Sequence, residues 1–174
     1  MRFAIYLGFD KKTENAIKDL RLALFEGVRH MPHPKKMPPH LSLFVFDSDD
    51  IDDVLGRFKA IADGMTRFDI KLGRIGAFRS RRSVLFLTPQ ITKSLKEAHR
   101  RAIEVYSGVD PAPAYQNPED WKPHVTLATG LAPRTFCDAE KLAEKVWKSA
   151  TAGIRLLGLI NVQKPLEILA SKNL

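Results

Sequence analysis

One short pattern occurs twice in the chain, and this repeat constrains the fold more than any other feature. Pro39-His40-Leu41-Ser42-Leu43 returns 84 residues later as Pro123-His124-Val125-Thr126-Leu127. In each copy a proline precedes a histidine, and apolar and polar positions then alternate, which is the period of a half-buried strand. Two extended residues span roughly 7 Å, so the histidine and the hydroxyl residue of each copy should lie side by side on one face.

The segments around the first copy predict three strands and two helices. β-Branched and aromatic runs predict strands, helical spacing of apolar residues predicts helices, and four prolines predict a loop before the motif. Asp10 is a suitable N-cap for the first helix. The predicted order is strand, helix, proline loop, motif strand, helix and strand, over residues 2–9, 11 to about 28, 30–39, 41–46, 51–62 and 68–78.

The second half repeats this order. We expect a strand over 83–87, a helix opened by Thr88-Pro89 with Ile91 in its buried stripe, and a proline loop over 108–120. The second motif strand should cover about 124–129. A further helix should start at Thr135, with Asp138 completing a capping box. Strands over 154–162 and 166–170, joined by a turn at 163–165, should end the chain as a hairpin.

The sequence therefore predicts an α+β fold with two similar lobes related by a pseudo-two-fold duplication. Each lobe should contain an antiparallel sheet with helices, and a central cleft should separate the lobes. We expect one domain over residues 1–174, with repeat halves of about 1–80 and 81–174, acting as a monomer. The alternative is an ordinary α+β domain whose halves look alike because such patterns are common.

Composition sets further bounds. The 174 residues are 44% hydrophobic, enough for a sizeable core. No apolar run is long enough to span a membrane and no basic leader precedes one, so we expect a cytoplasmic protein without a membrane partner. The single cysteine, Cys137, excludes an internal disulfide, and we expect it to be buried on a helix. The net charge of +8 favours a phosphate-bearing partner, or serves solubility alone.

Two histidines that face each other can act as one general base and one general acid, because the imidazole pKa of about 6.5 allows either role at neutral pH. The neighbouring Ser42 and Thr126 hydroxyls can donate hydrogen bonds to an anion. Displacement at a phosphate diester needs one proton removed from the attacking oxygen and one given to the leaving oxygen. His40 and His124 supply both without a metal or another cofactor.

The two copies, the second extended to Lys122-Pro123-His124-Val125-Thr126-Leu127-Ala128, resemble the paired His-x-Thr/Ser signatures of the 2H phosphoesterase superfamily. This group contains bacterial 2'-5' RNA ligase-like proteins and cyclic nucleotide phosphodiesterases. The resemblance implies a bilobal fold with a positively charged cleft and metal-independent action on 2',3'-cyclic or 2'-5' phosphodiesters, so the partner would be an RNA end or a nucleotide cyclic phosphate. It also implies that His40 and His124 are catalytic and that Ser42 and Thr126 bind phosphate.

Two other functions fit the same residues. The site could join RNA through 2'-5' junctions, which is the same phosphoryl chemistry with a different attacking oxygen. The chain could also be an RNA- or nucleotide-binding module that keeps the cleft and performs no chemistry. Both the enzyme and the binding module would lose affinity steeply with salt, so turnover separates them.

The remaining candidates carry weaker signals. Residues 71–82 contain five basic residues and no acid, and Arg79 and Arg81 could hold the phosphates of an oligonucleotide, unless they form a solvated hairpin tip. Trp121 precedes the second motif and could stack on a base or pack internally. His30 and His33 could join His40 at a metal, but the prolines around them oppose a regular ligand geometry, so we predict no metal site. His99 lies among charged residues and is expected on a solvated helix face.

Overall fold

The structure is a computed structural model, and it describes residues 1–34, 37–163 and 165–174 of the 174-residue chain. The predicted proline loop and final turn include Lys35, Lys36 and Lys164, which lie outside the described residues. The strands are β1 (Arg2–Phe9), β2 (His40–Asp47), β3 (Phe68–Phe78), β4 (Ser83–Pro89), β5 (Asp110–Pro111), β6 (Val125–Leu131), β7 (Ala150–Asn161) and β8 (Glu167–Asn173).

Four α-helices and two short 3-10 turns complete the part of the chain that the structure describes. They are α1 (Lys11–Gly27), α2 (Ile51–Asp63), α3 (Lys93–Val105), α4 (Pro133–Val146), η1 (Pro113–Tyr115) and η2 (Pro118–Asp120). None of the described helices is long and apolar enough to cross a membrane. The cytoplasmic location stays a prediction.

The strands form one antiparallel sheet in the order β5-β2-β1-β7-β3-β4-β6, and β8 pairs with Leu156–Asn161 of β7. Within it, the strands β2-β1-β7 and β3-β4-β6 are mirror-ordered about the central pair of β7 and β3. Strands β1 and β4, β2 and β6, and β7 and β3 therefore occupy equivalent positions in the sheet. The central β3 and β7 pair through their first residues, Phe68–Leu72 and Ala150–Ile154. Beyond these, β3 pairs with β4 and β7 pairs with β1. The fold is therefore α+β with the predicted two-fold arrangement of elements.

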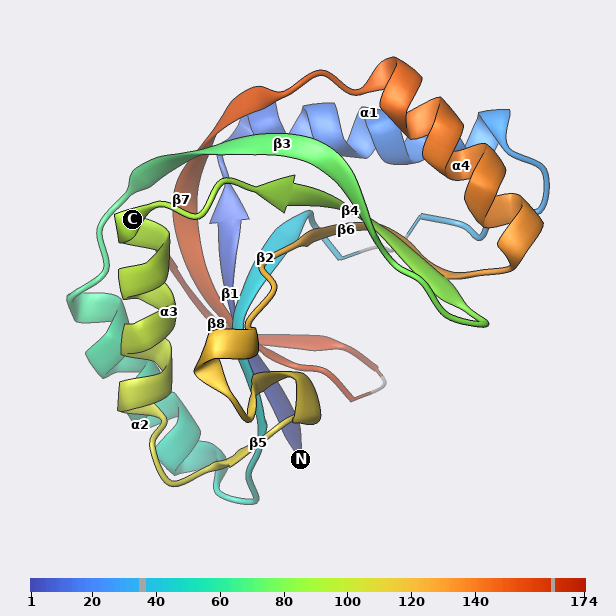
Figure 1. The fold of residues 1–174 in the computed structure, drawn as a ribbon. Coiled ribbons are helices and arrows are strands. Elements are labelled where there is room, and N and C mark those ends of the chain that lie inside the picture. The colour runs from blue at the N-terminus through green and yellow to red at the C-terminus, as the bar shows by residue number, and fades with distance from the viewer. Residues whose placement is uncertain (35–36, 164) are drawn as a thin grey trace.

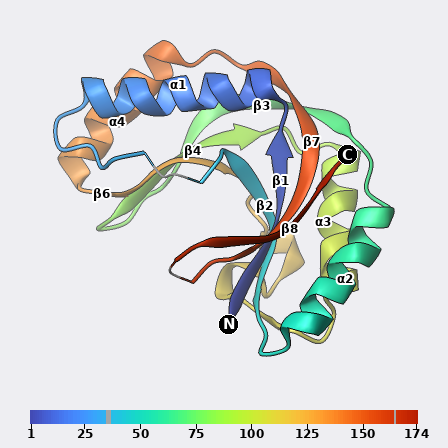
Figure 2. The ribbon, with the colours of Figure 1, turned by 180° about the vertical axis from the view of Figure 1, so that it is seen from behind.

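The helices pair across the two halves of the sequence. Figures 1 and 2 show α1 beside α4 and α2 beside α3, and the contacts agree. One lobe combines α1 and α4 with the strands that they contact, β3, β4, β6 and β7, and the other combines α2 and α3 with β2 and β8. Each lobe thus takes elements from both halves of the chain, so the two halves are interwoven.

Apolar periodicity explains most of the elements. In α1 the buried residues Ile17, Leu20 and Leu24 recur at helical spacing, and the Asp10 carboxylate accepts a hydrogen bond from the Thr13 amide at 2.7 Å, as an N-cap does. Strand β1 is buried on both faces from Phe3 to Phe9. Its alternate residues from Phe3 to Phe9 lie in the main core with the buried residues of the helices, whereas Ala4 and Tyr6 on the opposite face belong to a separate apolar cluster with Met37 and Ile160.

Two predicted helix starts were wrong. Thr88 and Pro89 continue strand β4, and α3 begins after Thr92, whose hydroxyl accepts from the Leu95 amide, so Ile91 is 50% exposed and outside the buried stripe. Helix α4 begins at Pro133 in its first turn, and Thr135 is buried instead of capping. The first prediction failed because Pro89 ends a strand and does not open a helix. The second failed because the Thr135–Asp138 spacing resembles a capping box, whereas Pro133 occupies the helix start that prolines favour.

The prediction for Cys137 was also wrong. This residue lies on the exposed side of α4. The stripe that α4 buries consists of Phe136, Ala139 and Ala143. Cys137 follows Phe136 by one position, and this offset of about 100° turns it away from the core.

Candidate functional site

The first motif lies on β2 as its alternation predicts. Leu41 and Leu43 are fully buried, whereas His40 and Ser42 are half-buried on the opposite face. The second motif follows the same pattern, with Val125 and Leu127 buried and both His124 and Thr126 half-buried. Both histidines therefore sit where a side chain is anchored by the sheet and still reachable from outside.

The two imidazoles make the same backbone contact. His40 Nδ1 lies 2.9 Å from the carbonyl oxygen of Pro38, and His124 Nδ1 lies 2.9 Å from that of Lys122, in each case two residues before the histidine. A carbonyl oxygen only accepts, so each Nδ1 carries the proton and donates it. In the neutral ring the unprotonated nitrogen is then Nε2, and this nitrogen is able to exchange a proton with a bound molecule.

A β-bulge follows the hydroxyl residue in both motif strands. Consecutive residues Ile5 and Tyr6 of β1 pair with Phe44 and Ser42, so Leu43 is extra. In the same way consecutive residues of β4 pair with Ala128 and Thr126, so Leu127 is extra. Bulges bend a strand and re-aim its side chains, and they occur often beside active sites. Here they sit at equivalent places in the two motifs.

The motifs meet in space. Strands β2 and β6 lie close together although they belong to opposite halves of the sheet order. Tyr115 of the loop before the second motif packs edge-on against Phe44 of β2 at 6.2 Å between ring centroids. The Tyr115 hydroxyl also forms a hydrogen bond with the side chain of Ser42. Burial of this hydroxyl raises the pKa of Tyr115 to about 12. Ser42 thus contacts the loop that carries His124.

A cavity of about 410 Å³ opens beside His124. The loop before the second motif lines it together with the end of β3. The lining residues that bear aromatic, charged or amide groups are Phe78, Tyr115, Gln116, Asn117, Asp120, Trp121, Lys122 and His124. This composition suits a ring with polar edges and a negative charge nearby, because aromatic faces stack on bases and Lys122 adds a positive charge.

The environment of His124 favours its neutral form. Its ring lies edge-on to Phe78 at 5.0 Å between centroids and near Phe86 at 5.3 Å. Burial lowers the pKa of His124, and the hydrogen bond to the Lys122 carbonyl opposes this shift. At neutral pH, therefore, Nε2 of His124 holds a free electron pair in the unbound protein.

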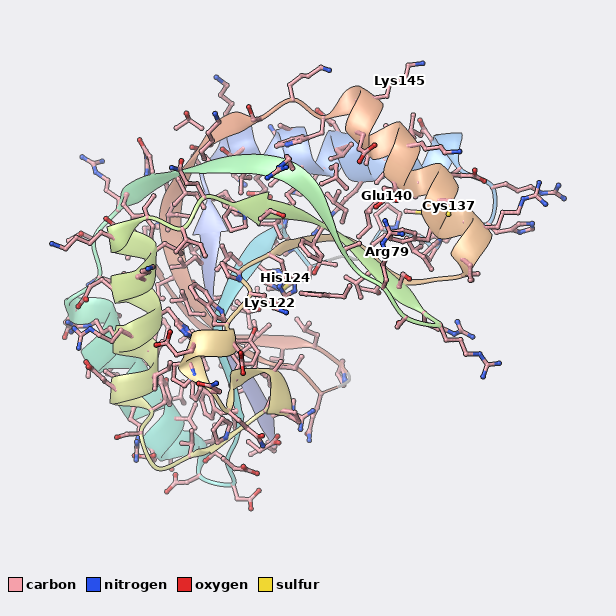
Figure 3. The ribbon with its side chains drawn as sticks, in the orientation of Figure 1. Arg79, Lys122, His124, Cys137, Glu140 and Lys145 are labelled. Atoms are coloured by element: carbon pink, nitrogen blue, oxygen red, sulfur yellow. The ribbon has the colours of Figure 1, made fainter. Side chains whose placement is uncertain are left out.

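The basic hairpin between β3 and β4 lies apart from His124. Arg79 forms an ion pair with Glu140 of α4 at 2.8 Å and lies over the Phe136 ring, and Figure 3 shows this pair away from His124. Arg81 is exposed in the turn between the strands. The structure therefore gives Arg79 an intramolecular partner and leaves Arg81 at a solvated tip.

His99 was expected on a solvated face, and this prediction was wrong. His99 is 7% exposed, its Nδ1 lies 2.8 Å from the Leu43 carbonyl oxygen, and its ring stacks on Trp121 with centroids 3.8 Å apart. One face of Trp121 is thus occupied by His99. The charged neighbours of His99 point away from the stripe of Leu95, Ala98 and Ala102 into which the histidine falls.

Within residues 1–34, 37–163 and 165–174, no group of three or more histidine, cysteine or acidic side chains is placed to hold a metal ion. A second cavity, of about 1080 Å³, lies between β3 and the end of α4, and Lys71, Arg74, Trp147 and Lys148 contribute to its lining. None of the four motif residues lines it, so it is separate from the histidines.

Sequence reasoning missed the aromatic neighbours of the histidines. Tyr6 lies edge-on to His40 at 5.4 Å, and Phe86 holds the equivalent place beside His124. A signal was present, because Tyr6 and Phe86 occupy corresponding positions in the first strands of the two halves. It could be used only once the strand register was known. Lys122, which provides both the carbonyl for His124 and a charge at the cavity, was likewise not singled out.

Comparison with known proteins adds a family and a fold. The sequence model described as 2'-5' RNA ligase superfamily matches residues 9–164. The Bacillus cereus (strain B4264) protein named "Putative phosphoesterase BCB4264_A1283" is 24% identical over 113 residues, which is 63% of this chain and 62% of that protein. The match therefore spans about three-fifths of the length of this relative.

Solved structures resemble the chain over nearly its whole length. TT0787 of Thermus thermophilus has 17% identity and a TM-score of 0.65, covering 100% of this chain and 98% of that one. LigT of E. coli, crystallised with 3'-AMP, has 14% identity and a TM-score of 0.62, covering 99% and 97%. Usb1 of Kluyveromyces marxianus has 10% identity and a TM-score of 0.54, covering 97% of each chain. At these identities the similarity establishes the fold.

Proposed function

Because the chain belongs to the 2'-5' RNA ligase superfamily, we propose that it is a metal-independent phosphoesterase that opens 2',3'-cyclic or 2'-5' phosphodiesters of RNA or nucleotides. The observation that carries this proposal is the identical fixation of the two imidazoles. Each donates Nδ1–H to a backbone carbonyl, so that Nε2 is the ring nitrogen without a proton in the neutral form. Nucleotide substrates also agree with LigT, which was crystallised with 3'-AMP, ATP and NADP+.

The two histidines divide the proton transfers of one displacement. For a cyclic phosphate, Nε2 of one histidine takes a proton from water, and the water oxygen forms a bond to phosphorus. The bond between phosphorus and one ribose oxygen breaks, and that oxygen takes the proton from Nε2 of the other, protonated histidine. The product is a monoester, and general acid–base steps of this kind contribute about 10²- to 10⁴-fold each.

We propose His124 as the base in this direction, because burial favours its neutral form. Apolar contacts with Phe78 and Phe86 accompany the burial that lowers its pKa. His40 would then be the acid. In the reverse reaction, ester formation, the two roles exchange, because the same protons move back along the same path.

Ser42 and Thr126 are proposed as donors to the phosphoryl oxygens. Each follows its histidine by two residues on the same strand face, so a phosphate held by both hydroxyls lies between both imidazoles. Among the weaker candidates, Arg81 remains a proposed contact to a flanking phosphate. Arg79 and Trp121 already have partners in Glu140 and His99, and a substrate would have to displace or share these contacts.

Two alternatives use the same residues. Ligation at 2'-5' junctions is favoured by the family description, and it differs only in that a ribose hydroxyl replaces water as the attacking group. A binding module without chemistry would keep the cavity beside His124 and the basic charge. The matched orientation of the two imidazoles favours the enzyme over the module, because binding alone does not require it.

The test is hydrolysis of the four nucleoside 2',3'-cyclic phosphates and of a short RNA with a cyclic-phosphate end, with excess chelator present. We expect turnover that resists chelation, with one ribose oxygen released preferentially. Incubation of two RNA fragments with matching ends tests ligation in the same series. Salt-sensitive binding of these RNAs without any turnover would instead establish the binding module.

A further inference from the structure

Arg21 of α1 joins the backbone of the two motifs. It is 6% exposed. Its guanidinium donates to the carbonyl oxygen of Met37, three residues before His40 (Nη1 to O, 3.2 Å), and to that of Thr126 in the second motif (Nη2 to O, 2.5 Å). Its Nε is buried and has no hydrogen-bond partner among the residues that the structure describes. Burying a cation costs free energy, and the hydrogen bonds to the two carbonyl groups offset part of this cost.

His99 of α3 makes the corresponding pair of contacts from the other half. Its Nδ1 donates to the carbonyl oxygen of Leu43 in the first motif strand at 2.8 Å. Its ring stacks on Trp121, three residues before His124, with an interplanar angle of 9°. Arg21 and His99 therefore make the same two kinds of contact. Each contacts the motif strand of the opposite half of the sequence, and each contacts the loop that precedes the motif histidine of its own half.

The two residues hold equivalent places in the fold. Arg21 and His99 each lie seven residues before the C-cap residue of their helix, Val28 and Tyr106 respectively. Their carbonyl partners lie at the two bulges: Leu43 is the extra residue of β2, and Thr126 directly precedes the extra residue of β6. Helix α1 packs on β6 and α3 packs on β2, so both contacts cross between the sequence halves.

We propose that Arg21 and His99 are positioning residues that hold the two motif histidines at a fixed separation. The inference rests on the proposed function, because the separation matters only if both histidines act on one phosphate. Arg21 fixes the bulge of the second motif relative to the loop of the first. His99 fixes the bulge of the first motif relative to the loop of the second.

The sheet alone leaves this separation weakly determined. Strand β6 ends the sheet order, and β2 has only the two-residue β5 on its outer side. The segments before both histidines are rich in proline, which cannot donate ladder hydrogen bonds. A misplacement of about 1 Å between reacting groups reduces turnover by about 100-fold, so contacts that cross between the motifs have a large effect on rate.

The test compares graded variants at both positions. Arg21→Met keeps the stem and removes the donors, and Arg21→Lys keeps the charge and one donor group. His99→Leu removes the donor, and His99→Asn keeps an N–H near the position of Nδ1. We expect kcat on a 2',3'-cyclic nucleotide to fall about 100-fold in Arg21→Met and His99→Leu with KM changed far less. Arg21→Lys and His99→Asn should recover part of the loss.

Matched controls lie on the exposed faces of the same helices. Lys18→Met on α1 and Lys96→Met on α3 should leave kcat unchanged. All rates are compared per folded molecule, with the folded fraction taken from urea unfolding curves. If the loss in Arg21→Met and His99→Leu equals the loss of folded protein, or if the conservative variants recover nothing, these residues only stabilise the fold and the proposal is overturned.

A second readout does not depend on activity. In NMR spectra of the histidine rings, Arg21→Met should move the Hε1 signals of both His40 and His124, and His99→Leu should do the same. The control variants should move neither. If wild type shows no turnover, the phosphoesterase proposal fails while this measurement still decides the positioning proposal. The positioning proposal is overturned if Arg21→Met leaves the His124 signal unmoved or if His99→Leu leaves the His40 signal unmoved.

Discussion

The two motif histidines have matching supports and different surroundings. Tyr6 pairs with Ser42 and lies against His40, and Phe86 pairs with Thr126 and lies against His124. On the far side of each aromatic ring the neighbouring strand has a glycine, Gly158 or Gly76. A Cβ added at Gly158 would overlap the Tyr6 ring, and one added at Gly76 would overlap the Phe86 ring.

The two histidines differ in the aromatic side chains beside them. The rings of Phe78 and Phe86 lie beside His124, whereas the ring of a tyrosine, Tyr6, lies beside His40. Backbone geometry is therefore shared between the halves, and the side chains around the histidines distinguish them. Under the proposed mechanism, a duplicated frame fixes the two proton-transfer groups alike while their surroundings give them different roles.

We propose on the same grounds that residues 1–80 and 81–174 are two copies of one unit. The mirror-ordered sheet, the paired bulges and the paired glycines all relate the same positions. Local packing at one site gives no reason for the other site to copy these features.

The largest expected effect comes from removing either histidine. His40→Ala and His124→Ala should each lower kcat on a cyclic nucleotide by about 10²- to 10⁴-fold, because each removes one proton transfer. Steady-state kinetics measure this loss, and far-UV circular dichroism checks that the fold is kept. A variant of either residue that retains most of its activity would break the equivalence between the two halves.

The glycines give the next largest effect. Gly76→Ala and Gly158→Ala should each lower the free energy of unfolding by about 1–3 kcal/mol, because the new methyl group displaces a buried aromatic ring. Urea unfolding measures both. Gly56→Ala is the matched control: nothing lies within 4 Å of its Cβ position in α2, so it should stabilise by up to about 1 kcal/mol. Equal stabilities of all three variants would contradict the close approach.

A smaller effect is expected at the outer bulge of β3, whose pairing with β4 shifts between Leu72 and Ile75. The Trp147 indole donates to the Gly73 carbonyl there at 3.0 Å. Trp147→Phe removes this hydrogen bond and should lower the free energy of unfolding by about 1 kcal/mol. Turnover should stay at the wild-type level, since the bulge is remote from the histidines. A loss of turnover in folded Trp147→Phe would mean that the functional site extends to the bulge of β3.

The pH dependence of stability should give the most gradual effect. Burial lowers the pKa of both His99 and His124 in the folded protein. The unfolded chain therefore binds more protons between the lowered values and about 6.5, so the free energy of unfolding should fall as pH falls through this window. Urea unfolding at several pH values measures the slope. His99→Asn should reduce it, and an unchanged slope would mean that His99 titrates alike in both states.

The sequence alone predicted the strands that carry the motifs. Alternation around His40 and His124 predicted two half-buried strands; His40 begins β2, and His124 directly precedes β6. The duplicated order of elements predicted the two-fold fold. Helical spacing located all four helices, although two of their starts were wrong. These features are local, and they depend only on apolar periodicity and caps.

Neither the bulges nor the hydrogen bonds of Arg21 and His99 between the two halves could be predicted from the sequence. Leu43 and Leu127 are aliphatic, and no glycine or asparagine marks either bulge. Arg21 and His99 are polar residues that fall within apolar stripes, at i+4 from Ile17 and Leu95, and this pattern was a usable signal. Their partners in the motif strands, the carbonyl groups of Thr126 and Leu43, lie more than 50 residues away in the sequence, and a sequence pattern does not identify them.

The account's central claim is that one histidine from each half forms a single acid–base pair. The most direct test is the double-variant cycle with His40→Ala, His124→Ala and both together, measured as kcat on one 2',3'-cyclic nucleotide. Groups that act as a unit are non-additive, so the double variant should be at most about tenfold slower than the slower single variant. Losses that multiply would show two independent contributions and contradict the claim.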